Sequence, residues 1–171
     1  GKGADNSTTW CERLGAKRPD LQAVNAGEEA YGLGQSYLKT KQLSSSLKWH
    51  VNVFAFIADD IRRMGTLDFM GRQKPRLVLS QGELQTQNVP VPEVSQLTLW
   101  MRANARVFKN LRFLEFAGRI GRKLGGSGAA LRGPRTDDEK AAVAGAILKA
   151  AQQLSAQQGA HFVAVFLPSG A

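Results

Sequence analysis

The sequence predicts a three-layer α/β/α fold, in which a parallel sheet carries helices on both faces. Segments of helical and strand character alternate in the order helix, strand, helix, strand, an insertion, helix and strand. Such alternation is typical of a parallel sheet. The 171 residues are 43% hydrophobic and 22% charged, which is enough for one domain with a core. We expect one α/β domain over 1–171, incomplete at both ends, with an insertion or lid over 72–135.

The first third of the chain predicts a helix, a strand and a second helix. The stretch "DNSTTWCERLG" opens with cap-type residues, and Glu12 follows Thr8 at close to capping-box spacing. We therefore expect a helix over 9–16. The run "LQAVNAG" predicts a strand over 21–27 that closes on a tight loop. The stretch "LGQSYLKTKQL", 33–43, has helical spacing of its apolar residues.

The middle of the chain predicts a buried strand and a hairpin. "HVNVFAFI", 50–57, is β-branched and aromatic and is the clearest strand of the chain. Asp59 and Asp60 then open a short helical turn. "RLVLSQGELQTQNVPVPE", 76–93, alternates apolar residues around a Gln-Gly turn, which indicates a hairpin or an irregular edge excursion.

The last part of the chain predicts two helices and a final strand. Apolar residues recur at steps of three and four over 97–124, which predicts an amphipathic helix. A Gly-rich link follows. Thr136 and three acidic residues then cap a helix that ends at Gly159. "HFVAVFLP", 161–168, predicts a final buried strand.

The net charge of +9 is concentrated in one segment. Nine cations and one acid, Glu115, lie between Arg102 and Arg135, so this segment holds nearly all of the excess. It is either the solvated face of a helix packed on the sheet, or a lid whose arginines attract anionic substrates or a membrane surface. A nucleic-acid-binding module is a third interpretation, but neither interleaved aromatic residues nor a recognition motif supports it, and no nucleic acid is expected as a partner.

Metal and disulfide chemistry have little support in the sequence. Cys11 is the single cysteine, and His50 and His161 are the two histidines. One cysteine forms no intramolecular disulfide, and this set is too small for most metal clusters. Both histidines open apolar runs, which favours positions at strand ends. We expect no metal and no cofactor. No signal peptide or membrane-spanning run is visible, and the compartment is left open.

Polar and glycine residues follow two of the predicted strands. Asn25 and Gly27 end the first, and Asp59 and Asp60 end the second. Ligands of open α/β sheets bind at the carboxyl ends of strands, so these residues would line one pocket if the strands are neighbours. The simpler interpretation is that an aspartate caps the helix beginning at Ile61 and that the glycine serves a turn.

Four stretches together resemble the SGNH (GDSL-type) hydrolases. "VNAGEEAYGLGQ" resembles their second block, Asn-x-Gly-x-x-Gly, and "FAFIADDIRRM" resembles the third, where a strand ends in Asn-Asp. "GKGADNSTTWCERL" is similar to the segment after the Gly-Asp-Ser nucleophile loop, and "VFLPSG" to the strand before the catalytic Asp-x-x-His. Order and spacing match over most of the chain outside Arg102–Arg135. The resemblance implies a flavodoxin-like sheet and a lipase-like serine esterase.

The resemblance also implies roles for individual residues. Gly27 matches the glycine whose backbone N–H donates to the oxyanion, and Asp59 stands where the family has an asparagine donor. Asn25, Tyr31 and Asp60 would then line the substrate pocket. The implied substrate is a small-molecule, carbohydrate or lipid acyl ester. The neighbouring pair Glu28-Glu29 is either a solvated turn or a contact to a polar substrate such as an acylated sugar.

The departures from the family pattern define a second interpretation. Neither the Gly-Asp-Ser loop nor the Asp-x-x-His segment is present between Gly1 and Ala171, so this chain alone is expected to be inactive. An ionised carboxylate at position 59 has no N–H to donate. Ala30 replaces the second glycine of its block. A non-catalytic interaction domain with the same fold is therefore the alternative to an esterase.

Overall fold

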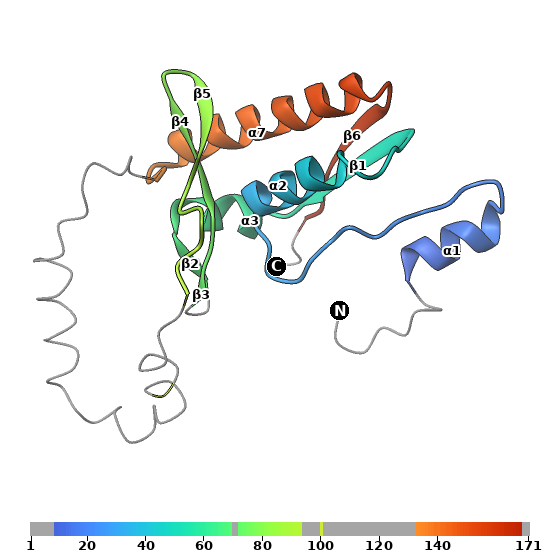
Figure 1. The fold of residues 1–171 in the computed structure, drawn as a ribbon, viewed down its shortest axis with the longest axis horizontal. Helices are drawn as coiled ribbons and strands as arrows, with labels where there is room; N and C mark the ends of the chain where they lie inside the picture. The colour runs from blue at the N-terminus through green and yellow to red at the C-terminus, as the bar shows by residue number, and fades with distance from the viewer. Residues whose placement is uncertain (1–8, 70–71, 94–99, 101–132, 169–171) are drawn as a thin grey trace, which may run out of the picture. The chain divides into compact units, whose positions relative to one another are not determined.

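The computed structural model describes residues 9–69, 72–93, 100 and 133–168. The chain divides into two compact units, one formed by Gly1–Arg62 with Ala144–Ala171 and the other by Arg63–Val143. Figure 1 shows the helices and strands of both units, coloured from the N-terminus to the C-terminus. The assignment of a single domain with an insertion at 72–135 stays a prediction. The helix expected over 97–124 lies outside the described residues, apart from Trp100.

The first unit is an α/β arrangement around a two-stranded parallel sheet. β1 pairs with β6 in parallel, from Val51 opposite His161 to Phe56 opposite Phe166. Parallel neighbours need a crossover connection, and here the chain that joins them contains the long helix α7. The elements are α1 (Trp10–Lys17), α2 (Leu33–Leu43), β1 (Val51–Phe56), α3 (Ala58–Arg62), α7 (Asp137–Gln157) and β6 (His161–Phe166).

The core of this unit lies between α7 and one face of the sheet. α7 buries Ala144, Ile147, Ala151 and Ser155, which recur at helical spacing on one side of the helix. The Ser155 hydroxyl accepts a hydrogen bond from the Asn52 side chain of β1 at 3.0 Å and donates to the Ala151 carbonyl at 2.9 Å. The buried Ser155 hydroxyl therefore has both a donor and an acceptor, and its bond to Asn52 joins helix to strand.

The opposite face of the sheet is exposed to solvent. Val51 and Val53 point away from the Asn52 side, because successive strand residues alternate between faces, and the register places Val163 beside Val53. Val53 is 53% exposed and Val163 44% exposed. The expectation that both strands are buried is therefore wrong for this face, since the described residues place no second layer over it.

The strand predicted over 21–27 is absent. These residues form no ladder with any described strand, and Val24 is 55% exposed. Instead, the Leu21 N–H donates to the Arg18 carbonyl in a turn. A strand is stable only when a neighbour satisfies its backbone groups, and the short apolar run supplies no such neighbour.

The second unit contains two small antiparallel ribbons. In the hairpin, Gln81 and Gly82 both have positive φ, 53° and 82°, as a two-residue type I′ turn requires, and the Gln-Gly turn is confirmed. Leu77 and Val78 are buried. The elements are η2 (Arg63–Gly65), β2 (Asp68–Phe69), β3 (Arg72–Gln73), β4 (Arg76–Ser80) and β5 (Glu83–Gln87), together with the start of α7.

A lysine is buried in this unit. Lys74 is 7% exposed, and its ammonium donates to the Arg63 carbonyl at 2.7 Å. Burial, together with the positive charge of Arg63, lowers the pKa of Lys74. The contact places the Lys74 ammonium beside the Arg63 carbonyl, at the negative end of the local peptide dipoles, where a cation is stabilised.

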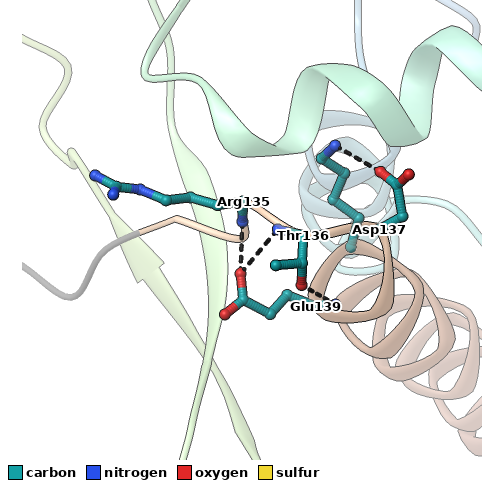
Figure 2. Close-up of polar contacts among 5 residues, drawn as sticks. Arg135, Thr136, Asp137 and Glu139 are labelled. Atoms are coloured by element: carbon teal, nitrogen blue, oxygen red, sulfur yellow. Dashed lines mark hydrogen bonds and ion pairs between the residues drawn. The ribbon is translucent and has the colours of Figure 1, made fainter.

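A complete capping box begins α7, as the sequence predicts for Thr136 (Figure 2). The Thr136 hydroxyl accepts from the Glu139 N–H at 3.1 Å, and the Glu139 carboxylate accepts from the backbone N–H groups of Thr136 and Arg135 at 3.1 and 2.6 Å. Two orphan donors of the helix start, and the N–H group of the residue before the cap, are thereby satisfied. At the other end, Gly159 has a φ of 72°, which ends the helix as expected. At the first helix the cap is Thr9 rather than Thr8.

The Glu139 contacts predict an acid-sensitive contribution to stability. The two backbone N–H donors lower the pKa of Glu139. A depressed folded-state pKa gives stability that is present above the unfolded-state pKa and is lost as the pH falls through the folded-state value. We expect Glu139→Gln to remove this part of the pH dependence. Denaturant unfolding between pH 3 and 7 measures it, and a profile that Glu139→Gln leaves unchanged would contradict the assignment.

No helix among the described residues is both long enough and apolar enough to cross a membrane.

Candidate functional site

The loop after residue 24 holds its glycine by an internal hydrogen bond. The Asn25 side-chain oxygen accepts from the Gly27 N–H at 3.1 Å, which is an Asx-type turn. The predicted oxyanion donor is therefore occupied within its own loop in this structure. Gly27 can donate to a substrate oxygen only when the Asn25 side chain turns aside.

The same loop is anchored to α2 by a cation. The Lys39 ammonium contacts the Glu28 carboxylate at 2.7 Å and lies 5.7 Å from the centre of the Tyr31 ring. The hydrogen bond with Glu28 raises the pKa of Lys39. Glu28 is therefore an exposed, ion-paired turn residue, and Tyr31 presents a ring beside a positive charge. The spacing between Glu28 and Lys39 gave no signal of this pairing in the sequence.

Ala30 adopts a backbone conformation that favours glycine. Its φ is 68°, in the left-handed region that costs a non-glycine residue about 1–2 kcal/mol. The resemblance to the SGNH family predicts a glycine at this position. The local backbone thus has the glycine-type conformation although the residue is alanine.

We expect Ala30→Gly to stabilise the protein by about 0.5–1 kcal/mol. The relief of strain exceeds the entropy that glycine adds to the unfolded chain. Ala26→Gly is the matched control in the same loop, because Ala26 is not among the residues with positive φ, and it should be neutral or destabilising. Chemical denaturation of the two variants measures the difference, and equal effects would exclude strain at Ala30.

The two aspartates that follow β1 both act within α3. Asp60 lies in the first turn, and its carboxylate accepts from the Ile57 N–H at 2.9 Å. The capping interpretation is therefore confirmed for Asp60, although the helix begins at Ala58 rather than Ile61. Asp59 is partly exposed and forms an ion pair with Arg62 at 2.8 Å. The i,i+3 spacing of Asp59 and Arg62 is a signal that the sequence offered.

The carboxyl edge of the sheet brings α3 and the chain after β6 together. β1 and β6 run parallel (Figure 1), so both strands end at one edge. The Leu167 N–H donates to the Phe56 carbonyl at 2.9 Å, which holds the chain beside the start of α3. The sheet does not place Asn25 and Gly27 at this edge, because residues 21–27 are not one of its strands.

No family model, curated protein or solved structure matches this chain. Within the described residues, no group of three or more His, Cys, Asp or Glu side chains is arranged to hold a metal ion. The histidines lie at strand starts, where the His161 N–H donates to the His50 carbonyl at 2.8 Å. Any assignment of function therefore depends on the local geometry of the loop that contains Gly27 and of the turn that contains Asp59.

Proposed function

We propose that this chain is the central portion of an SGNH-type serine ester hydrolase with a flavodoxin-like, three-layer α/β/α fold. The observation that carries the proposal is the parallel pairing of β1 with β6. It gives the Asp59 loop and the described chain that follows β6, Leu167 and Pro168, a common sheet edge. In the family, the third block and the Asp-x-x-His segment follow strands of this kind.

A second observation supports the assignment of the glycine loop. The positive φ of Ala30 is a conformation that favours glycine, the residue type that Asn-x-Gly-x-x-Gly has at this position. In this proposal Gly27 donates its backbone N–H to the tetrahedral oxyanion. Asn25 orders the loop between turnovers and releases the N–H when substrate binds.

Asp59 weakens the oxyanion site of the proposed enzyme. Its carboxylate accepts hydrogen bonds but donates none when ionised, and it is already paired with Arg62. Arg62 offsets part of the negative charge beside the reacting carbonyl. The serine and the Asp-x-x-His residues of the proposed enzyme belong to segments outside Gly1–Ala171. The serine attacks the ester carbonyl, and the histidine accepts its proton and returns it to the leaving alkoxide.

The proposal is tested by measuring the hydrolysis of short-chain p-nitrophenyl esters by the full gene product. We expect a Gly-Asp-Ser upstream of Gly1, an Asp-x-x-His downstream of Ala171, and hydrolysis that falls by at least about a thousandfold when the upstream serine becomes alanine. Ser7→Ala is the matched control, because Ser7 is not part of a Gly-Asp-Ser motif, and the substitution should leave the rate unchanged. A gene product without these motifs would favour the non-catalytic interaction domain. Hydrolysis that survives the serine substitution would reject serine catalysis.

A further inference from the structure

Helix α1 carries an apolar side that the described residues of its unit leave at least partly exposed. Trp10, Cys11 and Leu14 lie on one side of the helix, bordered by Lys17, and Glu12 and Arg13 lie on the other. None of the α1 residues is buried, and Trp10 is 54% exposed. The helix itself is well defined, since Thr9 caps it and an acidic residue lies in its first turn. An amphipathic helix of this length gains most of its stability from packing.

The exposed sheet face offers a complementary surface in the same compact unit. It consists of the valines Val51, Val53 and Val163, on two hydrogen-bonded strands. β-Branched side chains on a pleated sheet form a flat apolar surface. Val51 and Val53 lie about 6.6 Å apart along the strand. One turn of helix separates Trp10 from Leu14 by about 6 Å, so the two spacings match.

We propose that the face formed by Val51, Val53 and Val163 is the docking surface for the Trp10–Cys11–Leu14 side of α1. The linker from Arg18 to Gly27, which precedes the residue that anchors the loop to α2, permits this placement. Fully extended, it spans on the order of 33 Å, more than the width of a two-stranded sheet. The docked helix would bury both apolar surfaces and complete a second layer. This inference does not depend on ester hydrolysis.

Tethering favours α1 over a second copy of the chain as the occupant. A stable interface between proteins buries about 800 Å² on each partner, and three valines provide far less. A segment tethered within the same chain instead acts at an effective concentration of the order of millimolar. A small apolar contact is therefore sufficient within the chain and insufficient between chains.

Cys11 permits a direct test, because it is the single cysteine of the sequence. A second thiol is introduced by Val53→Cys, and a short thiol-specific bifunctional crosslinker is added at micromolar protein. The pH is mildly alkaline because burial and the nearby Glu12 raise the pKa of Cys11. We expect an intrachain crosslink, identified by peptide mass spectrometry. It should form at least about tenfold faster than in the matched control Gln153→Cys. Gln153 is exposed on the side of α7 away from the buried stripe.

Each outcome of the experiment decides the proposal. Val163→Cys should reproduce the fast crosslink, and Trp10→Ala should slow it in the Val53→Cys background. Far-UV circular dichroism of every variant confirms that the helices persist. Equal rates in Val53→Cys and Gln153→Cys would overturn the proposal. So would crosslinking that is mainly between chains and accelerates with protein concentration, since the occupant would then be a second copy.

Discussion

Replacing Ile147 by alanine is expected to lower the free energy of unfolding by about 2–5 kcal/mol. Ile147 is completely buried, and its neighbours along the α7 stripe, Ala144 and Ala151, are too small to fill the space it would leave. Removal of a buried isoleucine costs the transfer free energy of the lost atoms and the free energy of the cavity. Urea unfolding followed by circular dichroism measures the change.

The same helix offers a control for this prediction. Lys149→Ala changes an exposed residue of α7 and should alter the free energy of unfolding by no more than about 0.5 kcal/mol. If Ile147→Ala and Lys149→Ala have equal effects, then the stripe of α7 is not the core of the first unit. That result would contradict the packing of α7 on the sheet formed by β1 and β6.

Under the proposed function, Asp59→Asn is expected to raise ester hydrolysis by the full gene product about ten- to a hundredfold. The substitution replaces a charged acceptor by an amide that donates an N–H, and loss of one such donor costs roughly a hundredfold or more in other hydrolases. The ion pair with Arg62 is lost, but an exposed pair contributes little to stability. The gain should appear in kcat more than in KM, because an oxyanion forms only in the transition state.

Asp60→Asn distinguishes this effect from a general loss of charge. The Asp60 carboxylate accepts from the Ile57 N–H, and the amide oxygen of asparagine can do the same, so the rate should change little. Equal effects of Asp59→Asn and Asp60→Asn would indicate a charge effect alone. A rate that falls in Asp59→Asn would exclude the proposed oxyanion role of position 59.

Local sequence signals predicted the elements whose stability is local. The bounds of α2 coincide with the helical spacing over 33–43, and the hairpin forms around the Gln-Gly pair. The cap at Thr136 and the glycine stop at Gly159 were also readable, because each depends on residues within a few positions. The alternation of helices and strands also depends on local signals, and it indicated the α/β character of the chain.

Features that depend on distant partners were not predictable. The apolar run over 21–27 has strand composition, but composition does not supply the neighbouring strand that such a run needs. The contact of Lys39 with Tyr31 and the hydrogen bond between Asn52 and Ser155 join residues whose spacing carries no pattern. The candidate site was therefore predictable as two loops but not as one pocket. Which sheet face is covered could not be read from strands that are apolar on both sides.

The burial of Lys74 has a consequence for chemical labelling. Acylating reagents attack neutral amines, and a lowered pKa increases the neutral fraction, but a side chain that is 7% exposed cannot be reached. Acylation of Lys74 then requires a transient opening of the β-ribbons. The rate at which Lys74 is acylated, compared with that of the exposed Lys149, would therefore report how often the second unit opens.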